Sequence, residues 1–376
     1  MGMDKKERSI DMSEGPLRIG IIGTGGIARA YARAYREIPE AEVVGLCDII
    51  PGKAAAFGER EGFTKAKSYV QYNDMLEELE LDAVSVSTPN ASHAFITIDC
   101  LQAGKHVLCE KPMSVTLDEA VNMARAAKRA DRILSIGFQP RYDPNMQAIR
   151  ELVQSGILGK IYYVETGGGR RRGMPGGSFI NKEEAGFGAI ADIGCYSLDM
   201  AMNALGYPKP LTVTAQSRDD FGKSPKYNGG WDPEEFQVED FGTAFIRLEG
   251  DIVLYFKISW AMHLDTMGAT FFLGTDAGLK CTPGGTGNWG GAWDGGVGSI
   301  TLYHDLQGHQ TESSIPLKPR DFNLFTEKVR DFVLAVRDGG AAPIPGKQIV
   351  RNQAVIDGIL RSAALGKEVD IVIPEI

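Results

Sequence analysis

A glycine-rich turn near the start of the chain constrains the fold more than any other feature. Between the apolar segment 18–23 and a helical pattern at 28–37 stands the run Gly23-Thr24-Gly25-Gly26-Ile27-Ala28. The first glycine permits a tight turn, the second lets the backbone approach a pyrophosphate, and the small sixth residue allows close packing of helix and sheet. The helix N-terminus would add amides and a positive dipole end. A simple glycine turn is the alternative, but this context predicts that residues 23–27 bind a dinucleotide.

The chain up to about residue 140 alternates between short apolar runs and helical patterns. Further apolar runs lie at 43–49, 83–89, 106–112 and 133–138. Runs that are apolar on both faces are typical of buried parallel strands. Thr116 and Glu119 form a capping box that opens a helix through about Ala130. The series predicts an α/β Rossmann domain with a doubly wound parallel sheet over 17–140, after a polar, flexible leader at 1–16.

The rhythm changes after residue 141. We expect a helix at about 145–155, a strand at about 160–167, a helix at about 189–205 and then mostly strands to about 315. This order predicts an α+β domain over 141–376 with a large, open, mainly antiparallel sheet, and a C-terminal helix at about 350–366 that packs back toward the first domain. An uncovered sheet face favours self-association, so we expect a homodimer or homotetramer. A Gly-rich stretch at 283–298 with Trp289 and Trp293 is either a surface loop or a lid or intersubunit contact.

Composition excludes several classes of protein. The net charge of −9 is unfavourable for a nucleic-acid partner. No run is long and apolar enough to span a membrane, and the N-terminal segment lacks the apolar core of a signal peptide, so we expect a cytoplasmic protein. The five cysteines are scattered singly, which predicts neither disulfides nor a metal site.

Asp48 ends the second apolar run, some 23 residues after the glycine turn. An acid at about this distance accepts hydrogen bonds from the ribose hydroxyls of the adenosine. The carboxylate would repel a 2′-phosphate, so NAD is expected rather than NADP, although Lys53 is close enough in sequence to soften that conflict. A cap or turn residue is the alternative role of Asp48.

Two segments carry groups suited to proton transfer. In Glu110-Lys111-Pro112, at the end of the fourth apolar run, proline restricts Lys111 to an extended backbone that directs its side chain into the cleft. Asp192 and Tyr196 are four residues apart on an expected helix, so they share a face, with Cβ atoms about 5–6 Å apart. Tyr196 can accept the proton of a secondary alcohol only if its pKa, ordinarily about 10, is lowered, and a nearby Lys111 would lower it. A helix-terminal acid and a packed aromatic ring are the alternative roles of Asp192 and Tyr196.

Over residues 17–375 the sequence resembles the Gfo/Idh/MocA oxidoreductase family. The resemblance rests on the glycine turn, Thr88-Pro89-Asn90 followed by His93, the Glu-Lys-Pro run, the Phe138-Gln-Pro-Arg141 segment, and the D-x-G-x-x-x-x-D pattern that starts at Asp192. It implies that the Lys111 and Asp192 positions are catalytic, with histidine the usual base at position 196. Tyrosine stands there in this chain, which is similar to the glucose-fructose oxidoreductase branch. The resemblance also implies that Thr88, Asn90 and His93 border the cofactor.

These observations give three sets of expected site residues. The catalytic set is Lys111, Asp192 and Tyr196. The cofactor set is Gly23, Thr24, Gly25, Gly26, Ile27, Asp48, Thr88, Asn90, His93, Glu110, Lys111 and Gln139. The substrate set adds to Asp192 and Tyr196 the side chains of Arg141, Tyr142, Arg170, Arg172 and Phe179. Guanidinium groups suit sugar hydroxyls and acidic substituents, whereas a solvated patch is the usual alternative for a triple arginine.

Three functions fit this pattern. The first is an NAD-dependent oxidoreductase, with a cofactor that is tightly held or exchangeable, acting on a secondary hydroxyl of a sugar, polyol or glycoside to give a keto sugar. The second is a glycosidase that uses NAD for transient oxidation and elimination. The third is a non-enzymatic regulator that senses NAD or a ligand. Since fold alone does not choose among them, retention of Lys111, Asp192 and Tyr196 favours an enzyme.

Overall fold

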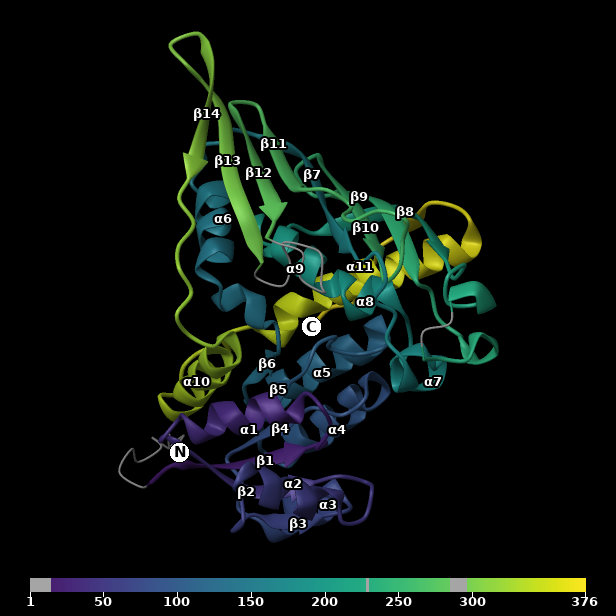
Figure 1. Cartoon of the computed structure of the whole chain (residues 1–376). Coiled ribbons are helices and arrows are strands. Elements are labelled where there is room, and N and C mark those ends of the chain that lie inside the picture. Colours follow the sequence, from purple (N-terminus) through teal and green to yellow (C-terminus); the bar gives the residue numbers. More distant parts are fainter. Residues whose placement is uncertain (1–14, 228–229, 285–295) are drawn as a thin grey trace, which may run out of the picture.

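A computed structural model describes residues 15–227, 230–284 and 296–376 (Figure 1). Most of the expected leader lies outside the described residues, and so does most of the Gly-rich stretch, including Trp289 and Trp293. Two sheets organise the chain. The first belongs to residues 17–136 and the second to residues 161–370.

The first sheet is parallel throughout, with the strand order β3-β2-β1-β4-β5-β6. This order confirms the doubly wound Rossmann sheet. Its strands are β1 (Leu17–Ile22), β2 (Ala41–Cys47), β3 (Lys67–Tyr69), β4 (Ala83–Val86), β5 (His106–Cys109) and β6 (Leu134–Ile136). The helices of this region are α1 (Ala28–Arg36), α2 (Lys53–Glu61), α3 (Tyr72–Glu78), α4 (Asn90–Gln102) and α5 (Leu117–Ala130), followed by the 3-10 turn η1 (Gln139–Tyr142).

The capping box predicted for α5 is present. The Thr116 hydroxyl accepts from the Glu119 amide at 3.2 Å, and the Glu119 carboxylate accepts from the Thr116 amide at 3.0 Å. Two donors that the helix end would otherwise leave unpaired are thus satisfied. The helix runs to Ala130, as the sequence predicted.

The second sheet has the strand order β14-β13-β12-β11-β7-β10-β9-β8-β15. It is mainly antiparallel, as expected, but β7 and β10 pair in parallel. The strands are β7 (Ile161–Gly169), β8 (Pro210–Arg218), β9 (Phe241–Leu248), β10 (Ile252–Ser259), β11 (Thr270–Gly274), β12 (Ala277–Pro283), β13 (Val297–Leu306), β14 (His309–Ile315) and β15 (Val369–Asp370). Helices α6 (Pro144–Gln154), α9 (Gly194–Ala204) and α11 (Gly346–Leu365) pack against one face of it (Figure 1).

The prediction of one continuous helix at about 189–205 is wrong, because the helix is broken. Residues Ala189–Asp192 form the short helix α8, and α9 begins only at Gly194. A Cβ at Gly194 would lie 2.7 Å from the ring of Phe256 on β10. A glycine therefore lets the chain pass close to the sheet at the break, and Asp192 and Tyr196 belong to two different helices.

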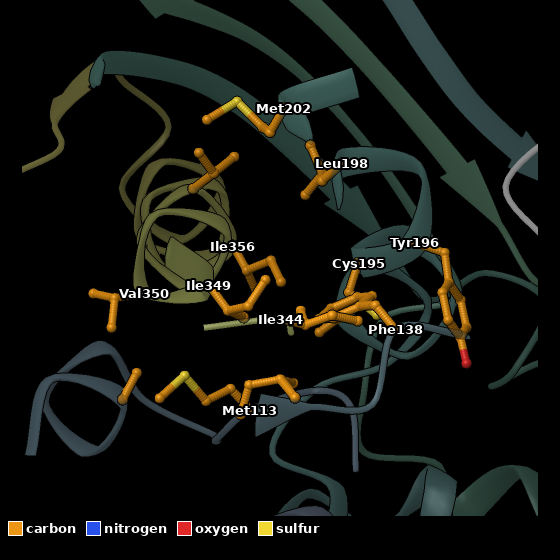
Figure 2. Packing of buried hydrophobic residues seen from close by; sticks show 14 of the residues in the cluster. Met113, Phe138, Cys195, Tyr196, Leu198, Met202, Ile344, Ile349, Val350 and Ile356 are labelled. Carbon is orange, nitrogen blue, oxygen red and sulfur yellow. The ribbon is translucent and has the colours of Figure 1, made fainter. Parts of the chain in front are cut away.

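Two helices from the end of the chain bind the first sheet to the second. Helix α10 (Leu324–Arg337), which the sequence pattern did not reveal, packs on α1. Helix α11 contacts both α5, beside the first sheet, and β8 of the second sheet. Figure 2 shows Ile349 and Ile356 of α11 on the side toward Phe138 and toward Cys195 of α9, whereas Val350 points away from them.

Among the described residues, no helix has the length and apolar character needed to cross a lipid bilayer. Within 15–227, 230–284 and 296–376, His, Cys, Asp and Glu side chains form no group of three that could hold a metal ion.

Candidate active site

The turn between β1 and α1 has the shape that a pyrophosphate requires. Gly23 has φ +89°, and a Cβ there would lie 2.7 Å from the carbonyl oxygen of Ser87 at the end of β4, so only glycine fits. A Cβ at Gly25 or Gly26 would meet no atom within 4 Å. The backbone of these two residues is therefore open to a ligand, directly in front of the N-terminus of α1. This arrangement fits a dinucleotide.

Asp48 lies directly after β2 and is joined to the glycine turn. Its Oδ2 accepts from the amide and hydroxyl of Thr24, at 3.0 and 2.8 Å, and Lys53 Nζ lies 2.9 Å away. Burial tends to raise the pKa of Asp48, but Lys53 and Thr24 outweigh it and hold that pKa below its usual value. Its Oδ1 accepts from the amide of Ile50 at 3.1 Å. Asp48 thus also serves as a turn residue, and contact with a ribose stays a prediction.

The ring of His93 is enclosed by the protein. Its side chain is buried, with Nδ1 2.8 Å from the carbonyl oxygen of Pro112 and Nε2 2.9 Å from that of Thr88. Burial lowers the pKa of His93 more than the two carbonyls raise it. The ring therefore joins the turn after β4 to the turn after β5, and its effect on a cofactor would be indirect. Nearby, Asn90 donates from Nδ2 to the carbonyl of Ala185 at 3.1 Å.

Lys111 meets Asp192 directly. Lys111 Nζ donates to the carbonyl oxygen of Asp192 at 2.8 Å and to its Oδ1 at 3.1 Å, and both side chains are almost fully buried. Burial lowers the pKa of Lys111, but Tyr196 and Asp192 outweigh it and raise that pKa above its usual value. The Lys111 side chain is therefore a fixed ammonium group.

Trp260 completes this arrangement, and sequence reasoning missed it. It directly follows β10, is fully buried, and donates from Nε1 to Asp192 Oδ2 at 3.1 Å. Each carboxylate oxygen of Asp192 thus has its own donor. A tryptophan at the end of a strand was the available signal, but only the fold brings it to Asp192. We call Lys111, Asp192, Tyr196 and Trp260 the lysine cluster.

Tyr196 is held from two sides. Its ring lies edge-on to Phe138, with centroids 5.8 Å apart, and Lys111 Nζ is 4.9 Å from its ring centroid. Gln139 Nε2 donates to its hydroxyl at 3.0 Å. In Figure 2 that hydroxyl points away from the buried apolar side chains. The bond from Gln139, expected to be a cofactor residue, therefore fixes the phenol oxygen.

The prediction that Lys111 lowers the pKa of Tyr196 below its usual value is wrong for the protein without bound ligands. Burial raises the pKa of Tyr196, and although Lys111 lowers it, as the sequence suggested, burial has the larger effect. Glu110 raises it further. Tyr196 is therefore a protonated phenol here.

Arg141 and Tyr142 are bound to side chains of neighbouring helices. Arg141 binds Asp199 of α9 through Nε and Nη2, at 2.8 and 2.6 Å, and Gln348 of α11 through Nη1 at 2.8 Å. Tyr142 donates to Asp331 of α10 at 2.8 Å. All three nitrogens of Arg141 are engaged within the protein. The structure thus gives both residues a role in joining helices, and their contact with substrate stays a prediction.

The arginine loop after β7 places a guanidinium group on two aromatic rings. The Arg172 guanidinium lies over the rings of Phe221 and Tyr227, 5.0 and 4.9 Å from their centroids, and donates to the carbonyl of Met262 at 2.7 Å. Met262 is two residues after Trp260, so this Arg172 stack adjoins the lysine cluster. Arg170 donates to Gly173 at 2.7 Å, within its own loop.

Two further residues complete the expected set. Phe179 lies in the 3-10 turn η2 (Gly177–Ile180) and is exposed. Glu110 is buried beneath Lys111, and its Oε2 accepts from the amide of Lys111 at 3.1 Å.

Comparison with known proteins places this geometry in context. The family model described as "Oxidoreductase family, NAD-binding Rossmann fold" matches residues 17–138, and the model described as "GFO/IDH/MocA C-terminal domain" matches residues 146–280. D-glucoside 3-dehydrogenase of Escherichia coli (strain K12) is 37% identical over 279 residues, which cover 69% of this chain and 78% of that protein. Glucose-6-phosphate 3-dehydrogenase of Bacillus subtilis (strain 168) is 34% identical over 188 residues, covering 49% and 52%. The crystal structure of aldose-aldose oxidoreductase from Caulobacter crescentus, complexed with glycerol, has a TM-score of 0.75 and 26% identity and covers 94% of this chain and 99% of that one.

Proposed function

Because the chain belongs to the Gfo/Idh/MocA oxidoreductase family and is an NAD(P)-dependent oxidoreductase of sugars or polyols, we propose that it oxidises the 3-hydroxyl of a D-glucoside or related pyranoside to a ketone. The observation that carries this proposal is the lysine cluster, where an ammonium group and a phenol are held together. Two similar proteins are named for oxidation at position 3. We also propose residues 17–140 and 141–376 as the two domains, with α10 and α11 joining them.

The residues of the cluster divide the work of alcohol oxidation. When bound, NAD⁺ supplies the hydride acceptor and a positive ring charge. Tyr196, after its phenol has released its own proton to solvent, takes the proton of the substrate hydroxyl, and the Lys111 ammonium stabilises both the phenolate and the negative charge that develops on the substrate oxygen. Asp192 and Trp260 hold Lys111 in place. Gln139 keeps the Tyr196 oxygen oriented. In the opposite direction, Tyr196 returns the proton to the new hydroxyl.

The Arg172 stack is proposed to contact the part of the glycoside that lies farthest from the reacting carbon. A cation and two aromatic rings suit the hydroxyl groups and the apolar face of a sugar. Arg172→Ala should raise KM for the substrate by about 10-fold with little change in kcat, because it removes binding that is equal in the ground and transition states. Steady-state kinetics measures this split, and a fall in kcat alone would contradict it.

The outer face of the second sheet is proposed to be the interface of a homodimer or homotetramer. Phe245, Tyr255, Glu165 and Phe271 lie in one row across β9, β10, β7 and β11, on the face away from α6, α9 and α11. Open sheet faces with apolar rings favour association. Sedimentation of the wild type and of Phe245→Lys tests this proposal. A monomeric wild type at micromolar concentration would contradict it.

The proposed reaction is tested with the full chain, NAD⁺ and a panel of methyl glucosides, glucose 6-phosphate and myo-inositol. We expect NADH to form with a glucoside, and NMR of the product to show a ketone at carbon 3. Release of the aglycone without accumulation of NADH would indicate the redox-neutral glycosidase instead. NAD binding with no turnover of any sugar, together with a ligand-dependent change in another protein's binding, would indicate a regulator.

A further inference from the structure

A buried ion pair lies directly beneath the turn that carries Lys111. Lys328 Nζ, on α10, is 2.6 Å from Glu110 Oε1. The hydroxyl of Tyr31, on α1, donates to the same oxygen at 2.7 Å, while Glu110 Oε2 accepts from the Lys111 amide at 3.1 Å. All of these side chains except that of Lys111 are almost completely shielded from water. Glu110 thus connects α1, α10 and the catalytic turn.

Lys328 is buried between two aromatic rings. Its Nζ lies 4.5 Å from the ring centroid of Tyr31 and 4.3 Å from that of Phe325. Gly137 closes the other side of the carboxylate, because a Cβ there would lie 2.8 Å from Glu110 Oε1. Ion pairs in such surroundings are a weak source of stability compared with apolar side chains of the same volume. A role in positioning explains the ion pair better than a gain in stability.

We propose that Lys328 is a positioning residue for catalysis, which acts through the Glu110 carboxylate to fix the backbone of Lys111. The proposal rests on the proposed function of the lysine cluster. Lys328 keeps Glu110 ionised and in place, the carboxylate holds the Lys111 amide, and the Lys111 side chain then reaches Asp192. Tyr31 extends the same support to the helix that follows the glycine turn. A displacement of about 1 Å at such a site can lower turnover on the order of 100-fold.

The ionisation of Glu110 gives this proposal a distinct signature. Burial raises the pKa of Glu110, but Lys328, Tyr31 and Lys111 outweigh it and hold that pKa below its usual value. At longer range, the charge of Glu110 tends to raise the pKa values of Cys109, His93, Cys195 and Tyr196. Without Lys328, burial becomes the larger effect, and the pKa of Glu110 rises. In Lys328→Met, Glu110 should therefore become protonated in an acidic pH range in which the wild type keeps it ionised.

The first experiment needs neither cofactor nor turnover. Infrared difference spectra between alkaline and acidic pH are recorded for the full chain without NAD. We expect Lys328→Met to show, besides the band of Glu239 that all variants share, a further band of a buried protonated carboxyl group that is absent from the wild type and from Lys328→Met/Glu110→Gln. If the single and double variants have identical spectra, Lys328 does not control Glu110 and the proposal is overturned. The double variant also leaves no uncompensated buried charge, which favours its folding.

The second experiment is a double-mutant cycle in kcat against pH. Lys328→Met should lower kcat by about 10- to 100-fold and add an acidic inflection. In the Glu110→Gln background the same substitution should change little, because its target is already neutral. Tyr35→Phe is the control. Tyr35 is on α1, like Tyr31, and the substitution removes its buried hydrogen bond with Ser85, so it should shift only the thermal midpoint. Equal losses in both backgrounds, or an unchanged kcat and pH profile in Lys328→Met, would refute the proposal. Failure of the proposed function is distinguishable, since the wild type itself would then oxidise no sugar.

Discussion

The glycine turn and the lysine cluster make opposite use of their surroundings. At the turn, Gly25 and Gly26 have no neighbouring atoms where a side chain would lie, so the backbone itself is available to a ligand. In the cluster, Asp192 and Tyr196 are buried, Lys111 is partly buried, and nearly every polar atom named above has a partner within the protein. The turn can bind a ligand because side chains are absent there, whereas the cluster depends on the contacts that each of its side chains makes. Binding and chemistry should therefore respond separately to mutation.

The largest effect is expected in the cluster, where Lys111 and Tyr196 act on one proton. Lys111→Ala and Tyr196→Phe should each lower kcat by about 100- to 10,000-fold, with little change in NAD affinity. The double variant should be scarcely worse than the slower single variant. Steady-state kinetics and NADH titration measure both quantities.

Tyr196→His sharpens this prediction. Burial raises the pKa of Tyr196, so oxidation by the wild type should increase toward alkaline pH, where the phenol gives up its proton more easily. Histidine has an ordinary pKa of about 6.5, so its variant should keep partial activity with an optimum at lower pH. Wild-type turnover by Tyr196→Phe, with a deuterium isotope effect showing that hydride transfer limits the rate, would move the base elsewhere, first to Asp192.

The next effect is expected at the glycine turn. Gly25→Val should weaken NAD binding on the order of 100-fold, because the new side chain would occupy the space open to the pyrophosphate. The thermal midpoint should not change. Gly23→Ala is the matched control, since its φ of +89° and its contact with Ser87 should cost about 1–2 kcal/mol of stability or more. Calorimetric titration and thermal unfolding separate the two. If Gly25→Val binds NAD like the wild type, the turn does not hold the pyrophosphate.

A smaller effect is expected at Asp48, where the turn meets the ribose. Asp48→Ala should reduce the preference for NAD over NADP by about 10-fold, because a negative charge facing the 2′-position is removed. Titration of the wild type and the variant with both cofactors measures the ratio. Equal affinities in the wild type would show that Lys53, 2.9 Å from the carboxylate, already cancels its effect.

The smallest effect concerns the support of the cluster. Glu239 Oε1 accepts from the amides of Gly188 and Ile190, at 2.8 and 3.1 Å, where α8 begins. Burial, opposed in part by these amides, raises the pKa of Glu239 to about 7. Since the folded-state pKa exceeds the unfolded one, the stability contributed by the protonated form is present at acidic pH and lost as the pH rises through about 7.

Glu239→Gln keeps the acceptor and removes the charge. The variant should be more stable than the wild type by about 1 kcal/mol at about pH 8, and the difference should disappear below about pH 5. Chemical denaturation at both pH values measures it. A variant that is less stable at the higher pH would show that the charge itself holds the start of α8.

The sequence was most informative where function depends on local order. The parallel sheet, the glycine turn and the α5 cap follow from runs of adjacent residues, and the structure confirms each of them. The break between α8 and α9 could not be predicted from adjacent residues, because Gly194 meets Phe256 only when β10 is in place. Helix α10 escaped notice for a similar reason, since its partner is α1, almost three hundred residues away in sequence.

Predictability within the site followed the same division. Lys111 and Asp192 were found by residue type and spacing, and they meet in the structure. Trp260 and Lys328 were not, because each contributes through a contact between distant segments. The effect of Lys111 on Tyr196 had the predicted sign, but its balance against burial could be judged only from the packed structure.

Helix α11 limits how relatives of this protein can be recombined. It contacts α5 of the first region and β8 of the second, and its apolar side chains belong to the same core as residues of both. A chimera with one crossover near residue 140 would pair α5 with an α11 from another protein. It would also separate Glu110 from the α10 that carries Lys328. A nucleotide domain grafted by itself therefore arrives without the helices that complete it. Working hybrids should need a second crossover before residue 324, so that α10 and α11 travel with the first 140 residues, and the new seam would then fall between α11 and β8.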